Sequence, residues 1–352
     1  MTALAPRQDG PGTGMVPGPR RRLPGMRLLG LVVALVVLAV LLVLSVMIGS
    51  TTIAPSVVWD ALFHPSADID QFAIRDYRLP RTVVGLVVGV ALGLSGALIQ
   101  ALTRNPLADP GILGVHAGAS FAVTVAVGVL GVRDVQGFLW FAFAGALIVT
   151  LVLLALGSTR QGSSPVVMVL AGVCVGAVLG GAREALQLTD SDAFDVVRSW
   201  NAGSIVGRPL EAVWPVLPFV TVALVLAFAV SGPLNAMALG DDLAVAQGVR
   251  LARTRVLAIV ALTLLAGGAT AVAGPIVFVG LMVPHVARWI VGPHQRWIFA
   301  YSAVLGAGLL LTSDVLGRVL MWPGEIPVGV ITAFVGAPVL IALVRRKKAS
   351  GL

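Results

Sequence analysis

The sequence has few of the residues that soluble surfaces, metal sites and catalytic sites require. Only 11% of its 352 residues are charged, whereas an ordinary soluble domain has about 25%. The single cysteine, Cys174, excludes an internal disulfide, and the four histidines have no metal-ligand spacing. No Ser/His/Asp or Cys/His arrangement indicates a hydrolase. We therefore expect no catalytic residues, no metal and no cofactor.

Lysine is also scarce, and so is charge within apolar segments. The only lysines, Lys347 and Lys348, lie near the C-terminal end, so there is no GxxxxGK[ST] phosphate loop and the chain cannot bind ATP in that way. No Asp, Glu or Lys falls in the middle of a long apolar run. Ion- and proton-coupled carriers usually need ionisable groups at that depth. If the chain moves a solute, we expect its energy source to lie in another protein.

Long apolar runs dominate what is present. The chain is 58% hydrophobic, and about 20 consecutive apolar residues suffice for a helix that crosses a bilayer. The sequence therefore predicts an all-α, polytopic membrane protein with about ten transmembrane helices. We expect spans at residues 28–48, 82–102, 112–132, 138–157, 166–187, 213–230, 256–274, 276–291, 298–317 and 327–344.

The distribution of charge predicts the orientation of these spans. With ten spans and the N-terminus inside, sixteen of the 24 basic residues fall on the inner side, against four acids. This excess follows the positive-inside rule, and it places both termini in the cytoplasm. It also explains the net charge of +8 without a nucleic-acid partner. We expect the chain to lie in a lipid bilayer.

The chain divides into a tail, a membrane domain and a second tail. Residues 1–27, rich in Pro, Gly and Arg, are expected to form a disordered cytoplasmic tail. Residues 28–344 form the transmembrane domain, and residues 345–352 a basic cytoplasmic tail. The apolar core of a signal peptide has about 7–15 residues. The first apolar run is longer, so we expect it to stay in the protein as a membrane span. Arg81 and Arg255 open similar spans five apart, which suits inverted five-helix repeats.

The inner connection at residues 231–255 has a pattern of its own. Gly240 precedes two acids, Asp241 and Asp242, as at the start of a helix whose first turn favours negative charge. Gly248 suits a left-handed cap that ends this helix. A short helix docked on a partner can pass a rigid-body movement to the spans on either side. We therefore interpret residues 231–255 as a coupling segment.

Four motifs occur in a fixed order along the chain. Residues 78–115 begin RLPR and end NPLADPGILGV, and residues 234–249 begin LNAMALG and end GV. Residues 274–285 read GPIVFVGLMVPH, and residues 325–338 begin EIPVGVIT and end GAP. These motifs resemble the permease subunits of bacterial ABC importers for iron-siderophores, haem and vitamin B12. The resemblance covers nearly everything after the N-terminal tail, with one departure at Gln247, where a leucine is common.

The resemblance implies an architecture and partners. In that family each permease has ten spans and lies in the bacterial cell membrane. A second permease, identical or different, completes a central pathway. Two cytoplasmic ABC ATPase subunits dock beneath the pair, and an extracytoplasmic binding protein delivers the substrate.

The resemblance also implies roles for particular residues. It places Arg78, Arg81 and Arg318 where a permease receives acidic residues of the binding protein, as charge-assisted pairs allow; snorkelling to the interface is the alternative. The residues expected to contact the ATPase are Leu239, Gly240, Asp241, Asp242, Ala244, Val245, Gln247, Gly248 and Val249. The residues expected to fix the turn between the second and third spans are Asn105, Pro106, Asp109, Pro110 and Gly111.

Two classes of function remain open from the sequence. The favoured one is the permease subunit of an ATP-driven importer for an iron-siderophore complex, and haem or vitamin B12 would suit the same architecture. The alternative is a stand-alone secondary carrier or channel. Uptake by this chain alone, driven by a proton gradient, would distinguish the second class from the first.

Overall fold

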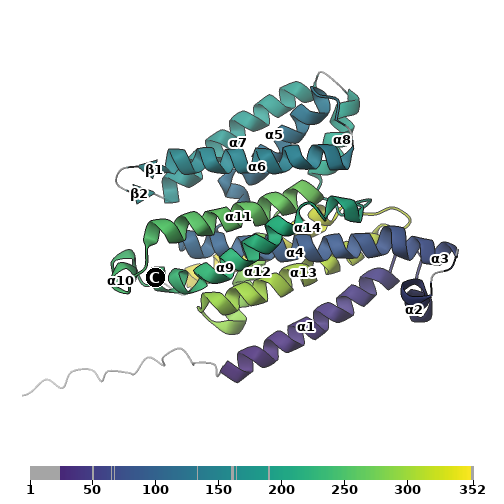
Figure 1. Ribbon diagram of the computed structural model, residues 1–352, viewed down its shortest axis with the longest axis horizontal. Helices are drawn as coiled ribbons and strands as arrows, with labels where there is room; N and C mark the ends of the chain where they lie inside the picture. Colours follow the sequence, from purple (N-terminus) through teal and green to yellow (C-terminus); the bar gives the residue numbers. More distant parts are fainter. Residues whose placement is uncertain are drawn as a thin grey trace, which may run out of the picture.

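Helices make up most of the described chain. The computed structural model describes residues 24–349, except residues 50, 65, 67, 133, 160, 161, 164, 189 and 190 (Figure 1). The long helices are α1 (Pro24–Met47), α4 (Leu79–Thr103), α6 (Val135–Gly157), α7 (Pro165–Gln187), α9 (Leu217–Met237), α11 (Leu251–Ala273), α13 (Gln295–Leu320) and α14 (Val328–Ala349). The shorter ones are α2 (Pro55–Phe63), α3 (Ile69–Phe72), α5 (Val115–Gly128), α8 (Ser191–Asn201), α10 (Asp241–Ala246) and α12 (Val279–Val291). A π-helical segment (Ala73–Arg78), two 3-10 turns (Pro110–Leu113, Leu210–Ala212) and a two-residue strand pair, β1 (Ser158–Thr159) with β2 (Gly162–Ser163), complete the described elements.

Each of the ten expected spans coincides with a helix. Six helical segments are long and apolar enough to cross a membrane by length and composition, and α5, α12 and residues 328–342 of α14 are shorter apolar helices. The expected tails have different bounds. Residues 24–27 belong to α1, residues 345–349 continue α14, and residues 1–23 lie outside the described part of the chain.

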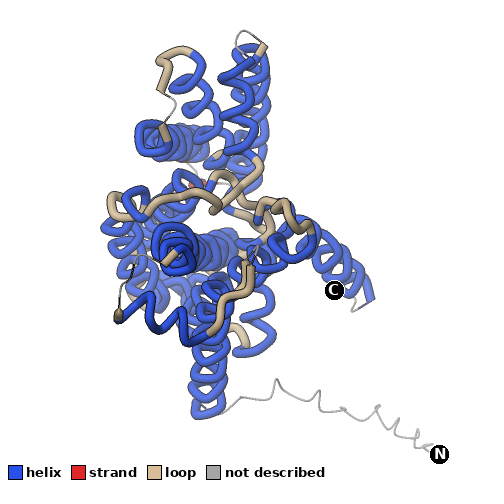
Figure 2. The backbone as a smooth tube through the Cα atoms, turned by 90° about the vertical axis from the view of Figure 1, so that its right-hand side faces the viewer, coloured by secondary structure: helices blue, strands red, loops and turns tan. Residues whose placement is uncertain are grey.

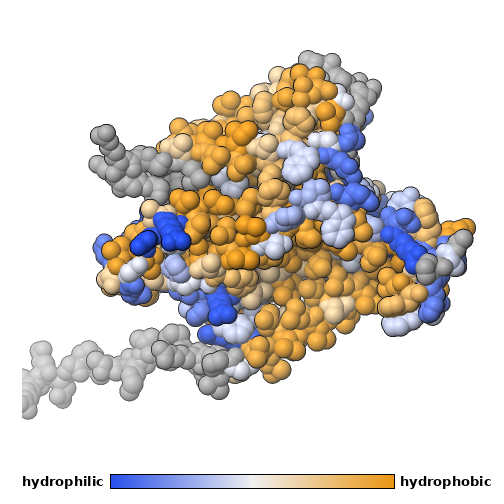
Figure 3. All heavy atoms as spheres, viewed as in Figure 1, coloured by the Kyte–Doolittle hydropathy of each residue, from blue (hydrophilic) through white to orange (hydrophobic). Residues whose placement is uncertain are grey.

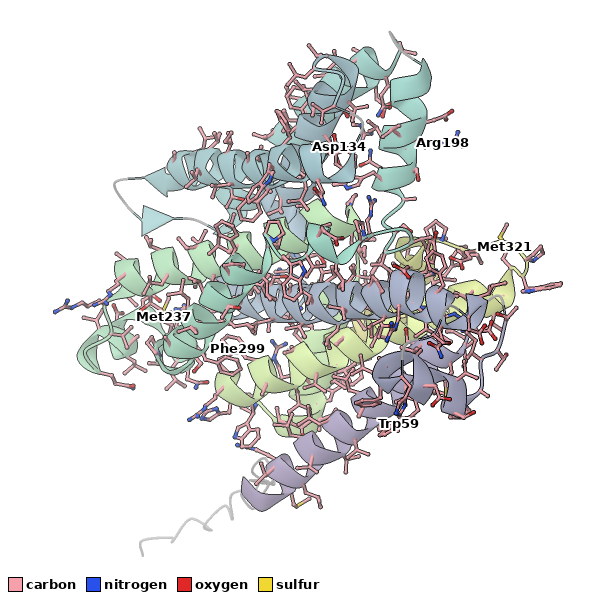
Figure 4. The ribbon with its side chains drawn as sticks, turned by 45° about the vertical axis from the view of Figure 1, so that its right-hand side comes forward. Trp59, Asp134, Arg198, Met237, Phe299 and Met321 are labelled. Atoms are coloured by element: carbon pink, nitrogen blue, oxygen red, sulfur yellow. The ribbon has the colours of Figure 1, made fainter. Side chains whose placement is uncertain are left out.

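The two ends of the bundle differ in what they carry. α1 begins and α14 ends on the side of α10, whereas α2, α3 and α8 lie at the opposite end (Figure 1). In the side-chain view, Met237 and Phe299 lie toward the α10 end and Met321 toward the other (Figure 4). Hydrophilic residues gather at the two ends, and hydrophobic residues cover the surface between them (Figure 3). This pattern agrees with the expected orientation, with the α10 end in the cytoplasm.

Helix α4 is the centre of the main bundle. Eighteen of its 25 residues are buried, and it packs against α9, α11, α12 and α13. Glycines let it approach its neighbours closely, as is common where helices pack in lipid. A Cβ atom added at Gly93 would lie 2.1 Å from the carbonyl oxygen of Ser302, and one added at Gly96 would lie 1.9 Å from that of Gly280. Only glycine fits these two positions.

Helices α5, α6, α7 and α8 form a group on one side of the main bundle, as two views show (Figures 1 and 2). α5 packs against α6 through Gly118 and Gly145, and both helices contact α11. Helix α1 lies on the other side of the bundle and contacts mainly α13. Only 17% of its span is buried, against 78% for α11. α1 is therefore a peripheral helix.

Candidate coupling segment and outer arginine cluster

The coupling segment folds as its sequence predicts. Gly240, at φ +121°, precedes α10, and Gly248, at φ +82°, follows it. Both angles fall where residues with a Cβ are strained. Asp241 and Asp242 occupy the first turn of α10. The predicted helix start and left-handed glycine are both confirmed, and α10 stands as a separate short helix between α9 and α11.

One carboxylate ties α10 to two other helices. Asp241 forms ion pairs with Arg104, at the C-terminal end of α4, and with Arg255, in the first turn of α11; the Arg255 Nη2–Asp241 Oδ2 distance is 2.6 Å. Burial acts to raise the pKa of Asp241, but the hydrogen bonds and charges of the two arginines outweigh it and lower that pKa. The carboxylate is therefore ionised at neutral pH and keeps both partners.

The side of α10 that faces away from the bundle is apolar and uncovered. Leu239, Leu243 and Val245 are 66%, 55% and 56% exposed, whereas Ala244 is fully buried and anchors the helix. Asp242, Gln247 and Gly248 are also exposed, and Val249 packs against the core. The expected coupling residues thus divide into an exposed set and an anchoring set. Leu243 was not among the residues expected to contact the ATPase, although it lies within the same short helix.

The turn after α4 is held by side chains that bond to nearby backbone. Arg104 takes a left-handed conformation at φ +52° and ends the helix. Asn105 Oδ1 accepts a hydrogen bond from the Leu107 amide at 2.9 Å, and Asp109 Oδ1 accepts one from the Gly111 amide at 2.8 Å. Pro110 then starts a 3-10 turn. These bonds fix the direction of the chain after α4.

The three outer arginines expected to meet a binding protein are buried. Arg81 lies 2.7 Å (Nη2–Oδ1) from Asp314, which also pairs with Arg318. Arg81 also contacts Glu325 at 2.6 Å (Nη1–Oε2). Arg78 donates hydrogen bonds to the carbonyl oxygens of residues 46, 47 and 51. Arg78, Arg81 and Arg318 are at most 8% exposed. Each guanidinium has partners within the chain, and docking of a binding protein at these arginines stays a prediction.

A cavity of about 670 Å³ opens at this outer end. Its lining contains all three of these arginines together with Arg208, but only two acids, Asp76 and Glu325. Burial lowers the pKa of Arg208 to about 10, so its guanidinium stays charged at neutral pH. Within the described residues its one hydrogen bond is to the Ser204 carbonyl, at 3.5 Å. With Asp314, which pairs with Arg81 and Arg318, four arginines meet three acids, so the cavity has one positive charge in excess. The sequence alone did not indicate that Arg208 joins this cluster.

Comparisons with known proteins agree over nearly the whole chain. The sequence matches the FecCD transport family over residues 37–346. Ferric enterobactin transport system permease protein FepD of Escherichia coli (strain K12) is 46% identical over 318 residues, which is 90% of this chain and 95% of that protein. Iron(3+)-hydroxamate import system permease protein FhuB of Bacillus subtilis (strain 168) is 37% identical over 308 residues, or 87% of this chain and 80% of that protein.

Solved structures share the fold. A metal-chelate type ABC transporter in an inward-facing conformation superposes with a TM-score of 0.77 at 27% identity, covering 90% of this chain and 98% of that one. PsaBC from Streptococcus pneumoniae, in complex with Fab, gives a TM-score of 0.57 at 18% identity, covering 77% of this chain and 91% of that one. The second likeness concerns the fold alone.

The substitution Asp241→Asn tests the link between α10, α4 and α11. We expect faster hydrogen exchange at the amides of α10, because both arginine pairs weaken, and unchanged exchange in the buried part of α4. Asp242→Asn is the matched control, because Asp242 is exposed and forms no ion pair with a described residue.

The same link predicts a dependence on pH. Since the pKa of Asp241 is lowered in the folded protein, both ion pairs are fully formed at any pH above the ordinary pKa of aspartate, and they are lost as the pH falls through the lowered pKa. Protection of α10 should thus stay constant from about pH 8 to about pH 5. Equal effects of the two substitutions would contradict the link.

Two substitutions distinguish the inner and outer parts of the arginine cluster. Asp314→Asn should lower the free energy of unfolding in detergent by about 3–5 kcal/mol, because the buried Arg318 loses its carboxylate partner and Arg81 keeps only Glu325. Glu325→Gln should cost at most about 1 kcal/mol, because the Glu325 side chain is 32% exposed. Similar losses for both variants would show that the cluster is not organised around Asp314.

Proposed function

The chain belongs to the FecCD transport family, and from this membership we propose that it is the permease subunit of an ATP-driven importer for an iron-siderophore complex. It is a multi-pass protein of the cell membrane. The observation that carries the proposal is the agreement of the family match with the relatives, which extend over nearly the whole chain and are named as permeases of iron-chelate uptake. ATP hydrolysis is assigned to a separate subunit, because the chain has no phosphate loop.

The exposed face of α10 is the proposed contact with an ATPase. Three large apolar side chains in water at the cytoplasmic end are a surface that a protein partner would cover. The ion pairs of Asp241 would then carry a movement of that partner into α4 and α11. We assign the contact to Leu239, Leu243 and Val245, with Asp242, Gln247 and Gly248 at its edge. A second permease, identical or different, would complete the pathway.

The outer cavity is the proposed docking place of a binding protein. Its excess of arginine favours acidic side chains on the partner. The hydrogen-bond donors of Arg78, Arg81 and Arg318 are already used within the chain. These three arginines would therefore act on the binding protein through their positive charge, from the floor of the cavity. Arg208 has one long hydrogen bond and lies outside the buried cluster. Arg208 is therefore the residue to which we assign a direct pair with a carboxylate of the binding protein.

The proposal predicts transport that depends on partners. In vesicles containing this chain, a second permease and the ATPase subunits, we expect uptake of a ferric siderophore only when ATP and the binding protein are both present. A proton gradient should have no effect, because no acid or lysine lies in the middle of a span. Vesicles that contain this chain alone are the control. Their uptake on a proton gradient would instead support a secondary carrier.

Binding of the ATPase provides a second prediction. Leu243→Ser should weaken association of the purified permease with its ATPase by about tenfold, because burial of a leucine contributes about 1.5–3 kcal/mol. Leu188→Ser is the matched control, since Leu188 is 90% exposed and follows α7 at the outer end. Surface plasmon resonance with the detergent-solubilised permease would measure both affinities. Equal weakening, or none, would reject α10 as the contact.

The affinity for the binding protein provides a third prediction. Arg208→Gln should weaken its affinity about tenfold or more, because the carboxylate of the partner would be left unpaired. Arg183→Gln, at the outer end of α7, removes the same charge outside the cavity lining and should leave the affinity unchanged. The thermal midpoint of each variant controls for folding. Unchanged affinity in Arg208→Gln would contradict docking over the cavity.

A further inference from the structure

An apolar groove lies between α1 and the pair α12 and α13. Its volume is about 360 Å³, and every residue that lines it is apolar. Val37 and Leu41 line it from α1, Met282 and Val286 from α12, and Val304 and Gly308 from α13. Val37 is 51% exposed, so the groove opens to the outside of the chain. All three helices run through the part of the molecule whose surface is hydrophobic, between the two hydrophilic ends. The groove therefore faces the hydrocarbon part of the bilayer.

A cation lies in line with this groove toward the cytoplasmic end. Arg27, Ala34 and Leu41 follow one another at intervals of seven along α1 and therefore share one face of the helix. Ala34 and Leu41 line the groove. The backbone of Arg27 is fixed, because the Tyr301 hydroxyl donates a 2.8 Å hydrogen bond to its carbonyl oxygen. The guanidinium lies beside the turn between α12 and α13, where a Cβ atom added at Gly292 would be 3.9 Å from Arg27 Nη2.

No carboxylate of the neighbouring elements neutralises this cation. Residues 24–47 and 279–309 contain neither Asp nor Glu. The Nε atom of Arg27 is buried and has no hydrogen-bond partner among the described residues. One half-buried cation without a carboxylate partner among these helices thus lies at the cytoplasmic end of an apolar groove.

We propose that the groove binds one acyl chain of an anionic phospholipid of the cytoplasmic leaflet, with the lipid phosphate at Arg27. The lengths agree. At about 1.5 Å per residue, Ala34 lies about 10 Å and Leu41 about 21 Å along α1 from Arg27. One leaflet contributes about half of a hydrocarbon core that is about 30 Å thick. Basic residues between membrane helices on the cytoplasmic side are a known recognition pattern for anionic headgroups. The lipid would fill the space between the peripheral helix α1 and the bundle.

Lipid retention tests the proposal independently of transport. The full-length chain is placed in nanodiscs of equal parts phosphatidylglycerol and phosphatidylcholine, and the lipids that remain after extraction are counted by native mass spectrometry. We expect phosphatidylglycerol to be enriched in the wild-type protein. The variant Arg27→Gln should lower the enrichment about fivefold. Ala34→Phe should fill the groove and reduce the retention of both lipids.

The controls separate this site from a general effect of charge and from a protein occupant. Arg345→Gln removes one cytoplasmic charge on α14, outside the groove lining, and should leave the enrichment unchanged. Thermal midpoints report whether each variant is folded. Unchanged enrichment in Arg27→Gln, or an equal loss in Arg345→Gln, would overturn the proposal. So would a disulfide-linked dimer formed through Val37→Cys in a Cys174→Ser background, because a second copy of the chain would then cover the groove.

Discussion

Direct backbone contact between α4 and its neighbours is the constraint on which the rest of the structure depends. Gly93 meets the carbonyl oxygen of Ser302, and Gly96 meets that of Gly280, so α12 and α13 are held against α4 without intervening side chains. Gln100 adds a 3.0 Å hydrogen bond from Nε2 to the carbonyl oxygen of Leu281. In lipid, where apolar side chains gain little from leaving the solvent, such close packing and buried hydrogen bonds hold helices together.

A rigid central helix explains the placement of charge at both ends of the bundle. At the outer end, Arg81 of α4 pairs with Asp314 of α13. At the inner end, Arg104 of α4 pairs with Asp241 of α10. The short helix that presents an uncovered apolar face to the cytoplasm is therefore attached to the central, largely buried helix α4. A movement imposed on α10 would be passed to α4 as a rigid-body displacement rather than absorbed by a loop.

Local patterns predicted the features that depend on nearby residues. The apolar runs located ten helices, and Gly240, the acids after it and Gly248 located α10, because caps and turns need particular residues at fixed offsets. Pairing across long separations was not predictable. Arg81 and Asp314 are 233 positions apart, and no single-sequence pattern shows that one neutralises the other. For this reason the partners of Arg78, Arg81 and Arg318 within the chain were not foreseen. The proposed inverted repeat stays a prediction.

The central claim is that α10 and the inner end of α4 move as one unit during transport. Spin labels at Ala246→Cys and Thr103→Cys, in a Cys174→Ser background, allow this distance to be measured by double electron–electron resonance in the assembled transporter. A rigid link predicts the same α10–α4 distance without nucleotide, with ATP bound and after hydrolysis. The distance between the label at Ala246→Cys and a label at the counterpart position in the second permease should change. A change in the α10–α4 distance on ATP binding would contradict it.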